Sequence, residues 1–170
     1  MQNVSSSNIT IKLQQLFSLF QKGQVKLVLK ELKPLLISAS DHGDVMHLAA
    51  MAYKADGDID KAISYFNSAL KINDNQSQVH NNIANAYKQI SNSKLAELHY
   101  NKAIKLHPQY VDAIKNLGLL YLQDKKLTQA KECFLRVLNL SKNNISALTS
   151  LGNIYKAEHD FVAAIAYYKQ

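Results

Sequence analysis

LGLLYLQDKKLTQAKECF, at residues 117–134, decides the fold, because LGNIYKAEHDFVAAIAYY repeats its pattern at residues 151–168. The step between the two stretches is 34 residues, and the same step joins three series of residues along the chain. The series are Tyr53, Tyr87, Tyr121 and Tyr155; Ala62, Ala96, Ala130 and Ala164; and Phe66, Tyr100, Phe134 and Tyr168. Recurrence in phase, with no insertion, indicates a tandem array whose unit is a pair of helices.

These residues resemble the tetratricopeptide repeat, whose motif reads W-x2-L-G-x2-Y, then A-x3-F, then P. One copy runs from His80 to Tyr87 and continues with Ala96, Tyr100 and Pro108. The positions where the family often has Trp hold Met46, His80, Ile114 and Leu148. The resemblance covers nearly the whole chain. It implies an all-α fold, a right-handed α-α superhelix of about five helix-turn-helix repeats.

The period divides the chain into a leader and five repeats. The leader, residues 1–8, is expected to be disordered. A degenerate repeat follows at 9–42, and further repeats are expected at 43–76, 77–110, 111–144 and 145–170, the last truncated in its second helix. In the degenerate repeat we expect a register shifted by one residue from the period. Its buried stripe would be Leu13, Leu16, Phe17 and Phe20, with Gln14, Ser18 and Gln21 turned outward.

Turn chemistry and small residues predict how each helix pair closes. We expect Gly57 to supply a positive φ after a helix, and Asp58 and Ser93 to cap the helices that come after them. Small residues in the first helices should let paired helices approach closely, with an aromatic side chain of the second helix alongside. They are Ala84, Gly118 and Gly152.

Composition limits the classes of function. The chain has 170 residues, 47% of them hydrophobic, which is ample for a packed helical array. One cysteine cannot build an internal disulfide framework. The sequence has neither a stretch apolar enough to span a membrane nor the pattern of a secretion signal, so we expect a cytoplasmic protein.

No constellation of residues indicates catalysis. The six histidines lack the spacing of a metal site. Cys133 and His99 occupy equivalent sites in neighbouring repeats, and one stacking step of roughly 10 Å is too long for a hydrogen bond. Phosphate-binding and nucleophile motifs are absent from the sequence. We therefore expect that the chain is not an enzyme and that it binds neither a cofactor nor a metal.

The resemblance implies that the first helices of the repeats line a concave groove. The side chains expected to bind a partner there are Asn81, Asn82, Asn85, Lys88, Lys115, Asn116, Asn153 and Lys156. Asp44, His47, Met51 and Lys54 precede them in the same groove. An Asn amide donates and accepts hydrogen bonds, so it suits a peptide backbone, although the same amides could serve only for capping and solvation.

The amides are similar to a partial version of the asparagine ladder in the repeat arm of O-linked N-acetylglucosamine transferases. Asn82 and Asn116 match its positions, whereas Leu48 and Ser150 do not. Lys54, Lys88 and Lys156 stand at the ends of first helices. Each either stabilises a helix C-terminus by about 0.3–1 kcal/mol or attracts an acidic segment of a partner.

The net charge of +7 and the pI of 9.4 raise nucleic acid as a partner. The lysines are spread over many faces, and aromatic residues do not alternate with them as in a base-stacking platform, so nucleic acid is not expected. A chain that stops at Gln170 without a polar capping helix could also associate with another copy through this end.

The sequence therefore predicts a non-enzymatic protein-protein interaction module that holds a partner peptide or helix in its groove. The alternative is a substrate-docking or regulatory arm of a larger glycosyl-, sulfo- or methyltransferase. The two interpretations differ in whether the gene encodes a catalytic domain beyond Gln170.

Overall fold

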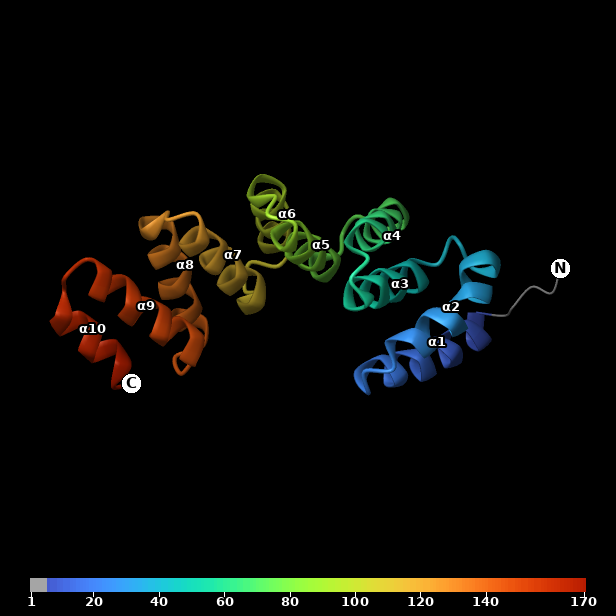
Figure 1. Cartoon of the computed structure of the whole chain (residues 1–170), viewed down its shortest axis with the longest axis horizontal. Helices are drawn as coiled ribbons and strands as arrows, with labels where there is room; N and C mark the ends of the chain where they lie inside the picture. The colour runs from blue at the N-terminus through green and yellow to red at the C-terminus, as the bar shows by residue number, and fades with distance from the viewer. Residues whose placement is uncertain (1–5) are drawn as a thin grey trace. The chain divides into compact units, whose positions relative to one another are not determined.

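A computed structural model describes residues 6–170, which form ten α-helices and no strand. The helices follow one another as hairpins joined by short turns (Figure 1). The hairpins are α1 (Ser6–Gln21) with α2 (Val25–Ser38), α3 (Gly43–Asp56) with α4 (Ile59–Ile72), α5 (Ser77–Gln89) with α6 (Ser93–Leu106), α7 (Val111–Gln123) with α8 (Leu127–Leu140), and α9 (Ile145–Ala157) with α10 (Phe161–Tyr168). The all-α helical-repeat fold is confirmed.

The chain forms two compact units, Met1–Ala86 and Tyr87–Gln170, with the boundary inside α5. In the first unit α1 packs on α2 and α3, and α3 packs on α4. In the second unit each of α6 to α9 packs on the next helix in the chain. Within each unit these helices therefore bury their apolar stripes against neighbouring helices, as expected when a single hairpin has too little core of its own.

The core consists of the residues that recur at the period. Ala62, Ala96 and Ala130 have no exposed surface, and neither do Phe66, Tyr100 and Phe134. Ala164 is 3% exposed, whereas Tyr168 at the aromatic position of α10 is 48% exposed. The predicted interlocking alanines and aromatics are thus buried in every hairpin that carries them, apart from Tyr168.

Small first-helix residues set how closely the paired helices approach. A Cβ on Gly118 would lie 3.0 Å from the Phe134 ring and 3.1 Å from Cβ of Cys133. A Cβ on Gly152 would collide with the Tyr168 ring. The predicted role of Gly118 and Gly152 is confirmed, and Ala84, at the equivalent site of α5, is fully buried.

The period-34 tyrosines of the first helices lie at hairpin interfaces. Tyr53 stacks on Tyr65 with ring centroids 5.3 Å apart, and Tyr155 stacks on Tyr167 at 5.4 Å. The hydroxyl of Tyr121 donates to Glu97 of α6 at 2.9 Å. These three tyrosines therefore tie α3, α7 and α9 to second helices.

Every hairpin turn places one residue in the left-handed region at the same step of the period. The residues are Gly23, Gly57, Ser91, Lys125 and His159, with φ between 58° and 93°. In each turn the amide of this residue and the next amide bond carbonyls of the preceding helix, for example Gly57 to Lys54 and Asp58 to Tyr53. The positive φ predicted at Gly57 is confirmed.

The helix caps agree with the prediction at one site and correct it at another. Asp58 caps α4 by accepting from the amide of Lys61 at 3.1 Å. The prediction of Ser93 as a cap is wrong, because Asn92 is the residue with cap geometry, and it accepts from the amide of Leu95. The hydroxyl of Ser93 instead donates to Asp124 at 2.9 Å.

The first helix departs from the sequence prediction at its start. Helix α1 begins at Ser6, so residues 6–8, expected in the disordered leader, are helical. Residues 1–5, the rest of that expected leader, lie outside the described residues.

The register predicted for α1 is also wrong in one respect. Leu16 is fully buried and Gln14, Ser18 and Gln21 are exposed as predicted, but Phe17 is 44% exposed. The turn at Gly23 lies in phase with Gly57, so the repeat keeps the strict period. In that register Phe17 is equivalent to Met51, a groove position, and α2 and α3 leave it partly uncovered.

Candidate functional site

The first unit contains a groove between α1 and α3. Its larger hollow has a volume of about 520 Å³ and is lined by residues of α1 and α3, among them Leu13, Phe17, His47 and Met51. A second hollow of about 300 Å³ lies next to it and shares Met51. The two hollows place the expected groove residues of α3 beside the aromatic residues of α1.

Asn82 and His47 are brought together at this groove. The amide nitrogen Nδ2 of Asn82 lies 3.0 Å from Nε2 of His47, and the imidazole ring packs 5.8 Å from the ring of Phe66. Since an amide nitrogen only donates, Nε2 accepts in this bond and the imidazole is neutral with its proton on Nδ1. Asn82 is thus held by the protein, with its carbonyl oxygen left to accept further bonds.

Burial lowers the pKa of His47 below its ordinary value, and the nearby charge of Asp44 acts in the opposite direction. The lowered pKa agrees with the neutral imidazole that the bond to Asn82 requires. Within the described residues, the buried Nδ1 of His42, another residue of the larger hollow, has no hydrogen-bond partner. His42 and His47 therefore place polar ring atoms along the groove.

Two predicted binding residues of the first unit differ in accessibility. Asn81 is 6% exposed, so it is a buried polar residue of α5 rather than a side chain offered to a partner. Asn85, one helical turn further along, is half-buried. The equivalent of Asn81 in α3 is His47, which lines the groove, so position in the period alone does not decide exposure.

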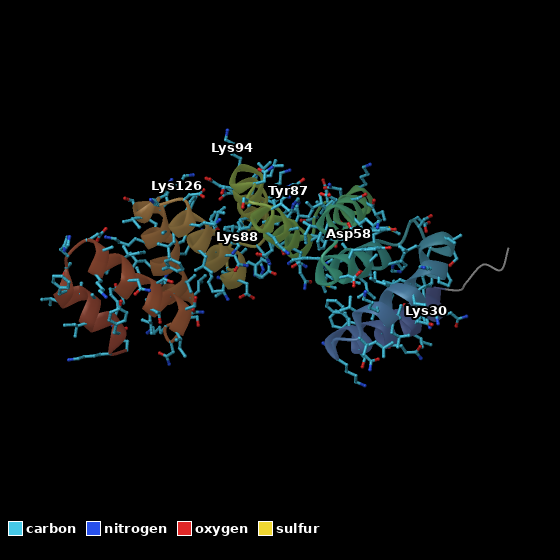
Figure 2. All side chains as sticks on the ribbon, viewed as in Figure 1. Lys30, Asp58, Tyr87, Lys88, Lys94 and Lys126 are labelled. Atoms are coloured by element: carbon cyan, nitrogen blue, oxygen red, sulfur yellow. The ribbon has the colours of Figure 1, made fainter. Side chains whose placement is uncertain are left out.

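In the second unit the predicted residues lie on α5, α7 and α9. Lys88 is half-buried near the end of α5, while Lys94 extends from the start of α6 (Figure 2). Lys115 forms an ion pair with Asp112, with Nζ and Oδ1 2.7 Å apart, and Asn116 beside it is half-buried. The charge of Lys115 is therefore partly compensated by its own helix.

The last repeat presents Asn153 and Lys156, and both are exposed. The carbonyl oxygen of Asn153 accepts from the hydroxyl of Tyr168 at 2.6 Å, which leaves its amide nitrogen to donate. Ser150, which stands where the ladder would need Asn, is only 7% exposed. Asn153 is thus an exposed amide of α9, whereas Ser150 is buried.

The Cys133 thiol does not have the pKa of an activated nucleophile. Burial raises the pKa of the Cys133 thiol to about 11, so the thiol is protonated at neutral pH and is a poor nucleophile. Among residues 6–170, no three His, Cys, Asp or Glu side chains are grouped so that they could hold a metal ion. No helix in this range has the length and apolar character needed to cross a membrane.

Family models described as tetratricopeptide repeat match residues 43–76, 77–110 and 99–132. The first two matches coincide with the hairpins α3–α4 and α5–α6, whereas the third begins within α6 and ends within α8. The chain belongs to the tetratricopeptide repeat family. Tetratricopeptide repeat proteins are in general interaction scaffolds without catalytic activity, so membership supports a role in protein interaction. No curated protein sequence matches the chain.

Solved structures share the tetratricopeptide repeat fold. PilF of Pseudomonas aeruginosa is 24% identical, with a TM-score of 0.87 over 94% of this chain and 73% of that chain. MamA is 20% identical, with a TM-score of 0.82 over 89% of each chain. YrrB, described as a tetratricopeptide repeat protein with an unusual peptide-binding site, is 16% identical, with a TM-score of 0.74 over 92% of this chain and 80% of that chain. At these identities the likeness shows the fold.

Sequence reasoning missed the contribution of α1 to the groove. The sequence pattern predicts Leu13, Phe17 and Phe20 in the core, yet each lines one of the two hollows. The available signal is the turn, since Gly23 precedes Gly57 by one period and fixes the register of α1. In that register these three residues are equivalent to His47, Met51 and Lys54, which the sequence predicts in the groove.

Proposed function

We propose that this tetratricopeptide repeat chain is a non-enzymatic interaction module that binds a peptide or helix of a partner protein on the exposed faces of its first helices. The observation that carries the proposal is the recurrence of amides at those faces. Asn82 and Asn116 are one period apart, and Asn85 and Asn153 are two periods apart. All four have exposed or half-buried side chains.

Amides suit a partner backbone, because an Asn side chain can both donate and accept hydrogen bonds. The carbonyl oxygen of Asn82 and the amide nitrogen of Asn153 remain to bond after their internal contacts with His47 and Tyr168. Lys88 and Lys156, at the ends of α5 and α9, favour acidic residues in the partner. Binding would thus combine backbone hydrogen bonds with weak selection for charge.

The test begins with affinity capture by the whole chain from the organism that encodes it, and identification of captured proteins by mass spectrometry. The dissociation constant is then measured for a variant with Asn82→Ala, Asn85→Ala and Asn116→Ala. Each lost hydrogen bond should cost about 0.5–1.5 kcal/mol, so binding should weaken by about tenfold or more. Circular dichroism should show that the helix content is unchanged.

Lysine variants separate the two contributions. Replacing Lys88 and Lys156 by Gln should lower the association rate and its salt dependence more than it raises the dissociation rate. The control replaces Lys102 and Lys105, exposed residues of the second helix α6, by Ala. A partner that is lost from this control and binds the asparagine variant normally would place the site on the second helices and contradict the proposal.

A further inference from the structure

The groove of the first unit differs in chemistry from the later first-helix faces. Phe17 of α1 is equivalent in the period to Met51 of α3 and Asn85 of α5. Phe20 is equivalent in the same way to Lys54 and Lys88. Phe17 is 44% exposed, and its ring centroid lies 6.5 Å from that of Phe20 on the same helix. An aromatic side chain left open beside a hollow indicates a surface suited to an apolar ligand.

The larger hollow has an apolar floor and a polar rim. Leu13, Phe17, Leu48 and Met51 contribute apolar surface, and Gln14 and Gln78 contribute amides. Its volume of about 520 Å³ lies within the range of roughly 300–1,000 Å³ typical of ligand sites. The hollow therefore has room for a large apolar side chain together with part of the backbone that carries it.

Each of the two hollows is lined by an aromatic residue of α1, and the two aromatic residues are three positions apart. Phe17 lines the larger hollow and Phe20 lines the smaller one, and residues three apart on a helix lie about 4.5 Å apart along its axis. Met51 forms a wall common to both. A ligand helix that presents apolar side chains three or four residues apart can fill both hollows at once.

Charge distinguishes the two ends of the groove. Asp44, an exposed residue in the first turn of α3, is the one side chain of fixed charge among those described that line the larger hollow. Lys54, in the last turn of the same helix, lines the smaller hollow. Although the chain has a net charge of +7, its larger hollow is thus complementary to a cation rather than to an acid.

We propose that the groove between α1 and α3 binds an amphipathic helix of a partner protein, which inserts two apolar side chains one turn apart and places a Lys or Arg beside Asp44. This inference rests on the proposed function and names the chemistry of the partner. Apolar anchors supply the affinity, and the pairing of Asp44 with the cation sets the direction in which the helix lies.

The experiment selects peptides that bind the whole folded chain from a phage-displayed random library. The selected peptides are then synthesised, and their dissociation constants are measured by fluorescence polarisation. We expect the selected sequences to carry Leu, Ile, Phe or Met at a spacing of three or four, followed or preceded by Lys or Arg. Phe17→Ser should weaken their binding by about tenfold or more. Asp44→Lys should weaken it too, and a peptide whose cation is replaced by Glu should recover binding to that variant.

Two matched controls lie in the same unit. Ile37→Ser removes an apolar side chain of α2 that is 83% exposed, and Asp60→Lys reverses an exposed acid in the first turn of α4, as Asp44 lies in the first turn of α3. Both controls should bind the selected peptides like the unmodified chain. Circular dichroism shows whether each of the four variants is folded. If Phe17→Ser does not fold, Asp44→Lys still tests the groove.

The outcomes separate this inference from the proposed function. Peptides that bind equally well to Phe17→Ser and Asp44→Lys, yet lose affinity for the variant lacking Asn82, Asn85 and Asn116, would overturn the inference and leave the proposed function standing. Failure of the library to yield any binding peptide would contradict both. Selected peptides rich in acidic residues and insensitive to Asp44→Lys would also overturn the inference.

Discussion

His47 shows how the packing of one residue sets its chemistry. Its imidazole is held between the amide of Asn82 and the ring of Phe66, and burial disfavours the charged form. Protonation would also place a second donor against the Asn82 amide nitrogen, which cannot accept. Both effects act against a charge on His47 in the folded chain.

This packing predicts a loss of stability in acid. Because the folded state lowers the pKa of His47, the unfolded chain takes up the proton first as the pH falls through the ordinary histidine value near 6.5. The contribution of neutral His47 to the free energy of unfolding is therefore complete above that pH and declines below it. Urea unfolding should therefore show a smaller decrease in stability between neutral pH and about pH 5 for His47→Gln than for the unmodified chain.

The control for His47 is His107→Gln, a change at an exposed histidine. It removes a histidine that takes no part in the contacts of His47 with Asn82 and Phe66. Equal slopes of stability against pH for His47→Gln and the unmodified chain would show that His47 is not protected from protonation.

At the scale of the element, the hairpin turns require a residue in the left-handed conformation but tolerate residues other than glycine at that position. All five turns use a left-handed residue, yet only Gly23 and Gly57 are glycines. Ser91, Lys125 and His159 adopt the conformation at an energetic cost that the capping bonds of the turn offset. The turn geometry is thus set by the way the hairpin closes and not by glycine itself.

Two glycines of the second hairpin should respond to alanine with opposite signs. Gly57 has φ +93° and open space around it, so Gly57→Ala introduces backbone strain of about 1–2 kcal/mol without a clash. Gly43 begins α3, and a Cβ there would lie 3.7 Å from Gln76 in ordinary contact. Gly43→Ala should therefore stabilise the chain by about 0.4–1 kcal/mol through the unfolded state.

Chemical denaturation of the two alanine variants measures both effects. The midpoint should move down for Gly57→Ala and up for Gly43→Ala. A shift of the same sign in both would mean that space rather than backbone conformation governs these positions.

At the scale of the whole molecule, the contacts divide the chain into the units Met1–Ala86 and Tyr87–Gln170. In repeat proteins stability is approximately a sum of repeat and nearest-neighbour terms, so damage can remain local. Ala130 is suited to test this because it lies in α8 with no exposed surface.

Ala130→Asp should unfold the second unit and leave the first largely folded. An unpaired buried polar group costs roughly 2–7 kcal/mol, and a charge costs more. Hydrogen-exchange mass spectrometry should show lost protection in α6 to α10, with protection retained in α1 to α4. Thr128→Asp, at an exposed site of the same helix, should change neither unit. Unaltered protection in α7 to α10 of Ala130→Asp would remove Ala130 from the core.

The sequence by itself determined the period, the number of hairpins and the residues between paired helices. It could do so because Ala62, Phe66 and their equivalents meet the same neighbours in successive hairpins, so one packing solution recurs along the chain. Gly57 and Asp58 were predictable for a similar reason, since turn and cap chemistry is local.

Only the tertiary structure decided which first-helix residues are open to a partner. His47, Asn81, Lys115 and Thr149 occupy one position of the repeat, yet Asn81 is buried and Thr149 is exposed. Phe17 reads as a core residue by composition and lies open beside a hollow, because α2 and α3 cover only one stripe of α1. Exposure depends on the size and placement of side chains on neighbouring helices, which differ from repeat to repeat, whereas the period records only what is common to them.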